Sequence, residues 1–257
     1  MTAIRTIKES EGEDFLELMC DVFGLDFNRA YDVFFTEPFF DLNRKWAIFE
    51  GKEMVSVLTT APLEFGWGRA FGVAGVATRK SRQHEGYAGR LLERVCKEGA
   101  RRGEPAALLF ARQIDLYEKL GFEPIDRVVR GTVAICEGET SSETLDSAVV
   151  VAKYDLWSNA HKDRLRRDSV RWRYWNWHLR TCTHYKDGYV CDELDTVREI
   201  VCSGAVGAVP VRVGTEWLGT AFMTDQLEIP LEGAQEEMIL MGRGVPGIPQ
   251  MFMTDQF

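Results

Sequence analysis

Hydrophobic and polar positions in the first part of the chain follow two periods, which predict a mixture of strands and helices. Loose alternation over residues 3–7 predicts an edge strand, and Ser10 and Glu13 form a capping-box pattern ahead of an amphipathic helix. A second helix is predicted over residues 28–35, ending at or before Pro38. The chain therefore opens with a strand and two helices.

A strand–loop–helix–strand unit follows. β-rich runs at residues 46–49 and 54–60 flank a polar turn and predict a hairpin. Small and β-branched residues at 71–78 predict a strand buried on both faces, and apolar residues recur at helical spacing over 88–99. A short buried strand is predicted at 106–110. Because such crossovers are right-handed, the strands on either side of the helix should be parallel neighbours.

The second part of the chain shows different patterns of polar and apolar residues. A short helix at residues 114–120 precedes a polar stretch, 137–143, which contains no apolar residue and predicts a surface loop. A basic, aromatic helix is predicted over 162–180. Strand-like runs follow at 199–202, 205–213 and 238–241. We therefore expect an α/β domain at residues 1–137, a linker at 138–147 and a smaller α+β domain at 148–257.

Composition and net charge exclude several classes of protein and disfavour others. The 257 residues are 45% hydrophobic and 28% charged, which excludes disordered and fibrous proteins. A net charge of −9 disfavours general nucleic-acid binding and favours cationic partners. The longest uncharged run, 200–211, is shorter than the roughly 20 apolar residues of a membrane span, and no secretory signal is evident at the start. Six cysteines without a CxxC pair favour a reducing cytoplasm.

The segment most informative about chemistry is residues 76–92, where a buried strand opens into a polar loop and then a helix. Gly86, Ala88 and Gly89 lie at the start of that helix, so backbone N–H groups at its positive end are open to an anion. The expected ligand at this helix N-terminus is a pyrophosphate group. An ordinary tight connection between a strand and a helix would show the same small residues.

Two motifs resemble one family. Residues 83–88, Gln-His-Glu-Gly-Tyr-Ala, match the Q/R-x-x-G-x-G/A signature of the GNAT superfamily of acetyl-coenzyme A-dependent N-acetyltransferases. Residues 117–122 are similar to the family's Y-E-x-x-G-F segment. With the order of elements, the resemblance covers about residues 3–136. The extra C-terminal part and the final Phe257 resemble the multi-domain enhanced-intracellular-survival-like acetyltransferases, although the chain is shorter than their three-domain members. The resemblance implies that the second domain is a degenerate GNAT-like module or another α+β module.

The resemblance implies an α/β fold with a central mixed sheet and acetyl-coenzyme A as co-substrate. The pantetheine arm would enter beside the strand at 71–78 and bond to its backbone, and the pyrophosphate would lie on the loop. Tyr117 would protonate the departing thiolate, because a phenol with a pKa near 10 carries its proton at neutral pH; a packed aromatic is the alternative. The implied cofactor-binding residues are Val76, Ala77, Thr78, Gln83, His84, Glu85, Gly86, Tyr87, Ala88 and Gly89.

Two departures from the family pattern concern charge. Glu85 puts a carboxylate beside the pyrophosphate site, which is unfavourable unless it faces solvent or pairs with Arg82 or Lys80. The strand at 71–78 has no Asp or Glu to act as general base. In the multi-domain relatives a C-terminal aromatic residue brings its α-carboxylate into the active site, so the resemblance makes Phe257 a candidate base or substrate anchor. A tail that merely closes a core is the alternative.

The other candidates are weaker. The basic helix at 162–180 could bind nucleic acid, but Trp172, Trp175 and Leu179 fall on one stripe, which favours a core face with the arginines in solvent. Cys182, His184 and Cys191 do not complete a four-ligand zinc set, so no metal is expected.

The expected function is transfer of an acetyl group from acetyl-coenzyme A to a primary amine by direct attack, with backbone N–H groups polarising the thioester carbonyl. The acceptor would be a small cationic molecule such as an aminoglycoside, polyamine or amino sugar, with protein amines also open. A non-catalytic acyl-coenzyme A sensor and a nucleic-acid-binding protein are the alternatives. A cytoplasmic protein without a membrane partner is expected, either monomeric or a homo-oligomer.

Overall fold

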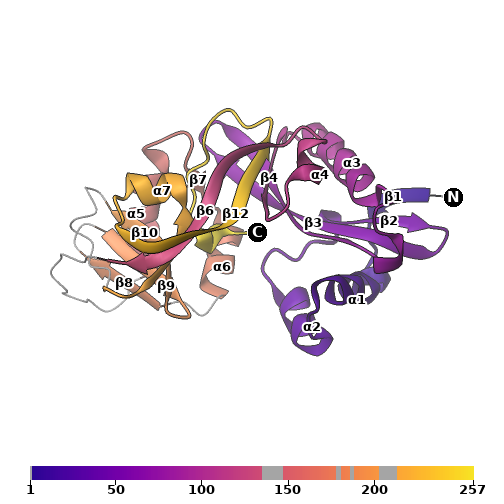
Figure 1. Cartoon of the computed structure of the whole chain (residues 1–257), viewed down its shortest axis with the longest axis horizontal. Helices are drawn as coiled ribbons and strands as arrows, with labels where there is room; N and C mark the ends of the chain where they lie inside the picture. The colour runs from indigo at the N-terminus through magenta and orange to yellow at the C-terminus, as the bar shows by residue number, and fades with distance from the viewer. Residues whose placement is uncertain (1, 135–146, 178–180, 186–187, 203–212) are drawn as a thin grey trace.

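One mixed sheet runs through the whole molecule (Figure 1). The computed structural model describes residues 2–134, 147–177, 181–185, 188–202 and 213–257. Short β7 (Leu165–Arg166) pairs with β3 (Glu53–Phe65) beside the main path of the sheet. In spatial order the strands are β1 (Thr2–Thr6), β2 (Lys45–Glu50), β3 (Glu53–Phe65), β4 (Gly68–Thr78), β5 (Ala106–Ala111), β12 (Leu231–Arg243), β6 (Glu123–Val133), β11 (Glu216–Thr220), β10 (Thr196–Cys202), β9 (Gly188–Glu193) and β8 (Thr181–Tyr185).

In the N-terminal half, helices cover both faces of the sheet. Helices α1 (Gly12–Phe23) and α2 (Phe27–Thr36) pack on one face, and α3 (Tyr87–Arg101) packs on the other with the short α4 (Asp115–Glu118). This confirms the two early helices, the hairpin and the crossover helix. The predicted parallel pairing is also confirmed, because β4 and β5 run parallel.

The start of α1 differs from the prediction. The helix begins at Gly12 after the 3₁₀ turn η1 (Glu9–Glu11), and its N-cap residue makes no side-chain capping bond. The Glu11 carboxylate instead accepts from the Lys8 backbone N–H at 2.7 Å and pairs with Arg5. A capping box based on Ser10 and Glu13 is therefore wrong, because Glu11 forms the corresponding bond to Lys8, two residues earlier in the chain.

The last long strand completes the N-terminal part of the sheet. β12 lies between β5 and β6 and pairs antiparallel with both, so residues 239–243 lie beside residues 107–111. β6 continues to pair with β11. Figure 1 shows β6 and β12 crossing between the two halves of the molecule. The predicted linker at 138–147 falls almost entirely outside the described residues.

The C-terminal half packs helices on its own strands around an aromatic core. The helices are α5 (Ser147–Asn159), α6 (Ser169–Trp177) and α7 (Ala221–Gln226), and Tyr154, Trp175 and Trp217 are buried among them. The predicted helix at 162–180 is too long, because Asp168 accepts from the Arg171 N–H at 2.8 Å and starts α6 only at Ser169. Residues 178–180 and most of the predicted strand at 205–213 lie outside the described residues.

Candidate active site

The strands β4 and β5 separate partway along their length. Their pairing covers Ala70–Val73 opposite Ala106–Leu109. Both strands are described throughout, and they continue to Thr78 and Ala111 without further pairing to each other. Beyond Val73, β4 therefore has main-chain N–H and C=O groups on its β5 side without a ladder partner on β5.

A β-bulge lies in this unpaired part of β4. Val57 pairs with Ala77 and Thr59 pairs with Ala74, so Gly75 and Val76 both face a single residue of β3. Gly75 has a φ of +59°, a left-handed conformation that suits glycine. Bulges re-aim the backbone, and here the bulge immediately precedes Ala77 and Thr78. Val76, Ala77 and Thr78 are all among the cofactor-binding residues that the resemblance implies.

The signature loop ends at the N-terminus of α3. Gly86 is the helix N-cap with a φ of 78°, and its carbonyl accepts the first intrahelical bond from the Arg90 N–H at 3.1 Å. The preceding N–H groups, at residues 87–89, have no intrahelical acceptor and carry the positive end of the helix dipole. A Cβ added to Gly86 would meet no atom within 4 Å, so the approach to these groups is open. The arrangement suits a phosphate group.

Glu85 is neutralised by a neighbouring cation. Its carboxylate accepts from Arg82 at 3.0 Å, and this hydrogen bond lowers the pKa of Glu85. Arg82 also bonds to Glu50 at 3.1 Å and to the Tyr87 hydroxyl. The pairing with Arg82 that the sequence required is therefore present. Lys80 instead pairs with Asp21 of α1 at 2.9 Å.

Tyr117 lies on α4, which packs against the first turn of α3. A Cβ on Gly89 would lie 3.8 Å from the side chains of both Leu116 and Leu120, so the two helices are in close contact there. Tyr117 is half-buried, with its ring 6.2 Å from the ring of Phe122. Burial raises the pKa of Tyr117, so its phenol keeps the proton at neutral pH.

Phe257 lies on the sheet where β4 and β5 separate. A Cβ on Gly72 would fall 2.3 Å from the Phe257 ring, and that ring is 5.4 Å from the ring of Phe110 on β5. Gly72 pairs with Leu108, next to the last pair of the two strands. Phe257 packs with the cluster on one face of the sheet and Tyr117 with the cluster on the other. The two candidate catalytic residues thus flank the separation from opposite faces.

A buried ion network holds the tail that carries Phe257. Arg167 has no exposed side-chain surface and pairs with Glu199 and with Asp255, each at 2.7 Å. Burial alone would raise the pKa of Glu199, but Arg167, Thr254 and Tyr189 hold it below the ordinary value. The guanidinium of Arg167 also lies 3.8 Å from the centre of the Tyr154 ring.

The same network ties the tail to the N-terminal half. Arg171 lies 3.6 Å from the Asp255 carboxylate and donates to the Pro62 carbonyl of β3 at 2.6 Å. The expectation that the arginines of this region face solvent is therefore wrong for Arg167 and Arg171, because each has a buried carboxylate partner that is distant in sequence. The core positions of Trp172 and Trp175 are confirmed, whereas Leu179 lies outside the described residues.

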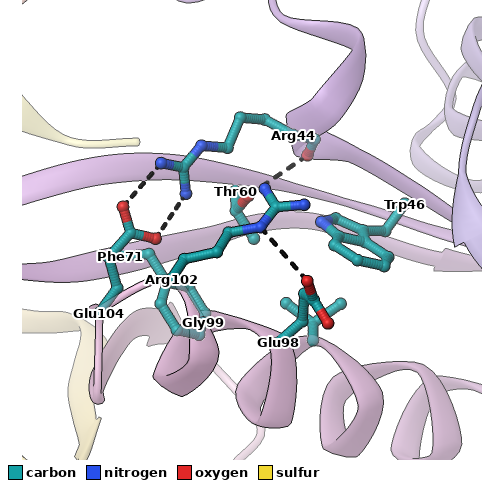
Figure 2. A pocket seen from close by; sticks show the side chains of 9 residues that line it. Arg44, Trp46, Thr60, Phe71, Glu98, Gly99, Arg102 and Glu104 are labelled. Atoms are coloured by element: carbon teal, nitrogen blue, oxygen red, sulfur yellow. Dashed lines mark hydrogen bonds and ion pairs between the residues drawn. The ribbon is translucent and has the colours of Figure 1, made fainter.

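A small cavity at the other end of α3 is a structural site. Figure 2 shows Arg44 facing Glu104 and Arg102 beside Trp46 and Glu98. Arg44 donates to both carboxylate oxygens of Glu104 at 2.7 Å. The cavity volume of about 10 Å³ holds at most one water molecule. These ion pairs stabilise the C-terminal end of α3, and the cavity is too small for a ligand.

Two further observations concern metals and membranes. The part of the chain that the structure describes contains no group of three or more His, Cys, Asp or Glu residues that could hold a metal ion. Within the same ranges, no helix combines the length and the apolar character needed to span a membrane.

Comparisons with known proteins agree with this geometry. Residues 3–125 match the family model of the acetyltransferase (GNAT) domain. No curated protein matches the chain. Among solved structures, a GCN5-related N-acetyltransferase from Kribbella flavida superposes with a TM-score of 0.73 at 19% identity, over 95% of this chain and 72% of that one. A GCN5-related N-acetyltransferase from Anabaena variabilis gives 0.70 at 16% identity, with the same coverage.

The fold of the whole chain also occurs in Eis1 from Mycobacterium abscessus, with a TM-score of 0.64, 16% identity and coverage of 93% of this chain and 73% of that one. At these identities the neighbours establish the fold, and the match of residues 3–125 establishes the family of the N-terminal half. The chain therefore carries a GNAT acetyltransferase domain over residues 3–125, and its C-terminal part shares the fold of these solved structures.

Proposed function

We propose that the protein transfers the acetyl group of acetyl-coenzyme A to a primary amine of a small cationic molecule. The observation that carries the proposal is the separation of β4 from β5 beside the open N-terminus of α3. Main-chain groups of Val76, Ala77 and Thr78 would bond to the pantetheine arm as a strand partner would. The N–H groups around residues 83–89 would hold the pyrophosphate.

The chemistry follows from the groups at this separation. A neutral amine attacks the thioester carbonyl, and main-chain N–H groups of β4 stabilise the negative charge that develops on its oxygen. Tyr117 then donates its proton to the sulfur as the carbon–sulfur bond breaks. The raised pKa of the phenol keeps this proton available at neutral and moderately alkaline pH.

Phe257 supplies the negative charge that β4 lacks. A terminal α-carboxyl has a pKa of about 3.5 and is ionised at neutral pH. It would attract the ammonium form of the acceptor and take up the proton that the amine loses. The position of the Phe257 ring against Gly72 and Phe110 supports this role.

A methyl group at Gly72 should disturb the tail. Because the added Cβ would overlap the Phe257 ring, Gly72→Ala should shift the terminal residue and lower kcat for acetyl transfer by about 10²-fold. Acetyl-coenzyme A affinity, measured by calorimetry, should change little. A chain that lacks only Phe257 is the matched comparison, and full activity in both variants would show that the tail only closes the core.

The test of the proposed function is an acceptor screen. Coenzyme A thiol release is measured with a panel of polyamines, aminoglycosides, amino sugars and lysine peptides, and the acetylated products are identified by mass spectrometry. Turnover with a cationic small amine supports the proposal. Tight binding of acetyl-coenzyme A without turnover of any amine would favour the sensor alternative.

A further inference from the structure

Two cysteines face each other in the hairpin formed by β8 and β9. Cys182 is the direct partner of Cys191 in the antiparallel register, and their Sγ atoms are 2.9 Å apart. Directly opposite residues in such a ladder have Cα atoms about 4.5–5.5 Å apart, which lies within the range of about 4.4–6.8 Å found in disulfides. The two sulfurs can therefore be joined without rearranging the strands.

The surroundings of the two thiols differ. Cys191 is buried, and burial raises its pKa well above the ordinary value. Cys182 is half-buried and so is the thiol that a small reagent from solvent reaches first. Cys202 on β10 offers a contrast, because its register partner on β9 is Gly188.

We propose that Cys182 and Cys191 form a reversible disulfide when the protein meets a peroxide. The Cys182 thiolate attacks one peroxide oxygen and becomes a sulfenic acid, while the other oxygen leaves as hydroxide. The Cys191 sulfur then displaces the sulfenic hydroxyl, and water leaves with the Cys191 proton. The two thiols lose two electrons, the peroxide is reduced to water, and a dithiol returns both cysteines to the reduced form.

The cross-link would lie next to the buried ion network around Arg167. Cys191 is also the direct partner of Glu199 on β10, and Glu199 binds the Arg167 that holds Asp255. The disulfide would thus fix the strand next to the network that anchors the tail. The proposal is independent of acetyl transfer, since it depends only on the two thiols.

Peptide mapping tests it directly. Cleavage after Arg180, Lys186 and Arg198 places the two cysteines in separate tryptic peptides, 181–186 and 187–198. After brief treatment of the full chain with hydrogen peroxide and blocking of remaining thiols, the unreduced digest should contain these two peptides joined, with two hydrogen atoms fewer than their sum. Reductant should separate them, and four of the six cysteines should stay titratable as thiols.

The control is Cys202→Ser, which should form the same cross-link, whereas Cys182→Ser should form none. Because no variant is needed for the mapping itself, a misfolded variant cannot hide the result. The oxidised chain should also unfold at a higher temperature than the reduced chain. Oxidation of Cys182 to sulfinic acid without the joined peptides, or joined peptides that reductant does not separate, would overturn the proposal.

Discussion

Replacing Arg167 with alanine should lower the free energy of unfolding by about 3–5 kcal/mol, the usual cost of removing one partner from a buried ion pair. The variant would leave the carboxylates of Glu199 and Asp255 buried without their cation, and both are almost completely excluded from solvent. Chemical denaturation of the full chain, monitored by tryptophan fluorescence, measures the loss.

Arg173→Ala is the matched control for this prediction. Arg173 belongs to the same arginine-rich segment but is exposed on α6, so its removal should change the free energy of unfolding by no more than about 0.5 kcal/mol. If both variants lose similarly little stability, the network does not hold the C-terminal tail in the way described above.

Replacing Tyr117 with phenylalanine should lower kcat for acetyl transfer by about 10²–10⁴-fold, the usual contribution of a positioned general acid. The ring and its packing against Phe122 are retained, so the affinity for acetyl-coenzyme A and the unfolding temperature should stay close to those of the wild type. Steady-state kinetics with an amine found in the screen gives kcat and KM separately.

The pH dependence provides a second measure of Tyr117. The active form of an acid is the protonated one, and burial raises the pKa of Tyr117 above its ordinary value of 10.0. The midpoint of any activity loss from this group should therefore lie above pH 10. An unchanged kcat in Tyr117→Phe would show that the ring is only a packed aromatic.

The local part of this architecture could be predicted from the sequence. The strand at 71–78, the loop with Gly86 and the helix that follows are encoded by adjacent residues, so periodicity and small side chains were sufficient to locate them. The apolar C-terminal tail also indicated burial, and Phe257 does pack against the sheet.

The remaining features depend on contacts between distant segments. Nothing near residues 231–243 indicates that β12 will pair with β5 rather than extend a separate domain. The sequence predicts Arg167 and Arg171 in solvent, because the tryptophans of this segment form the apolar stripe of the helix. The carboxylates that pair with these arginines lie 32 to 88 residues further along the chain. Contacts of this kind leave no periodic signal in the sequence.

The loop before α3 is the proposed binding site for the pyrophosphate of acetyl-coenzyme A. The most direct measurement is a calorimetric titration of acetyl-coenzyme A into the wild type, Gly86→Glu and Gly103→Glu. Both glycines have left-handed backbones with open space around a Cβ, so the two variants carry the same strain and charge. Gly103 lies just beyond the far end of α3, roughly 22 Å along the helix. We expect micromolar binding to the wild type and to Gly103→Glu, and loss of binding in Gly86→Glu. Equal binding to all three proteins would contradict the proposed cofactor site.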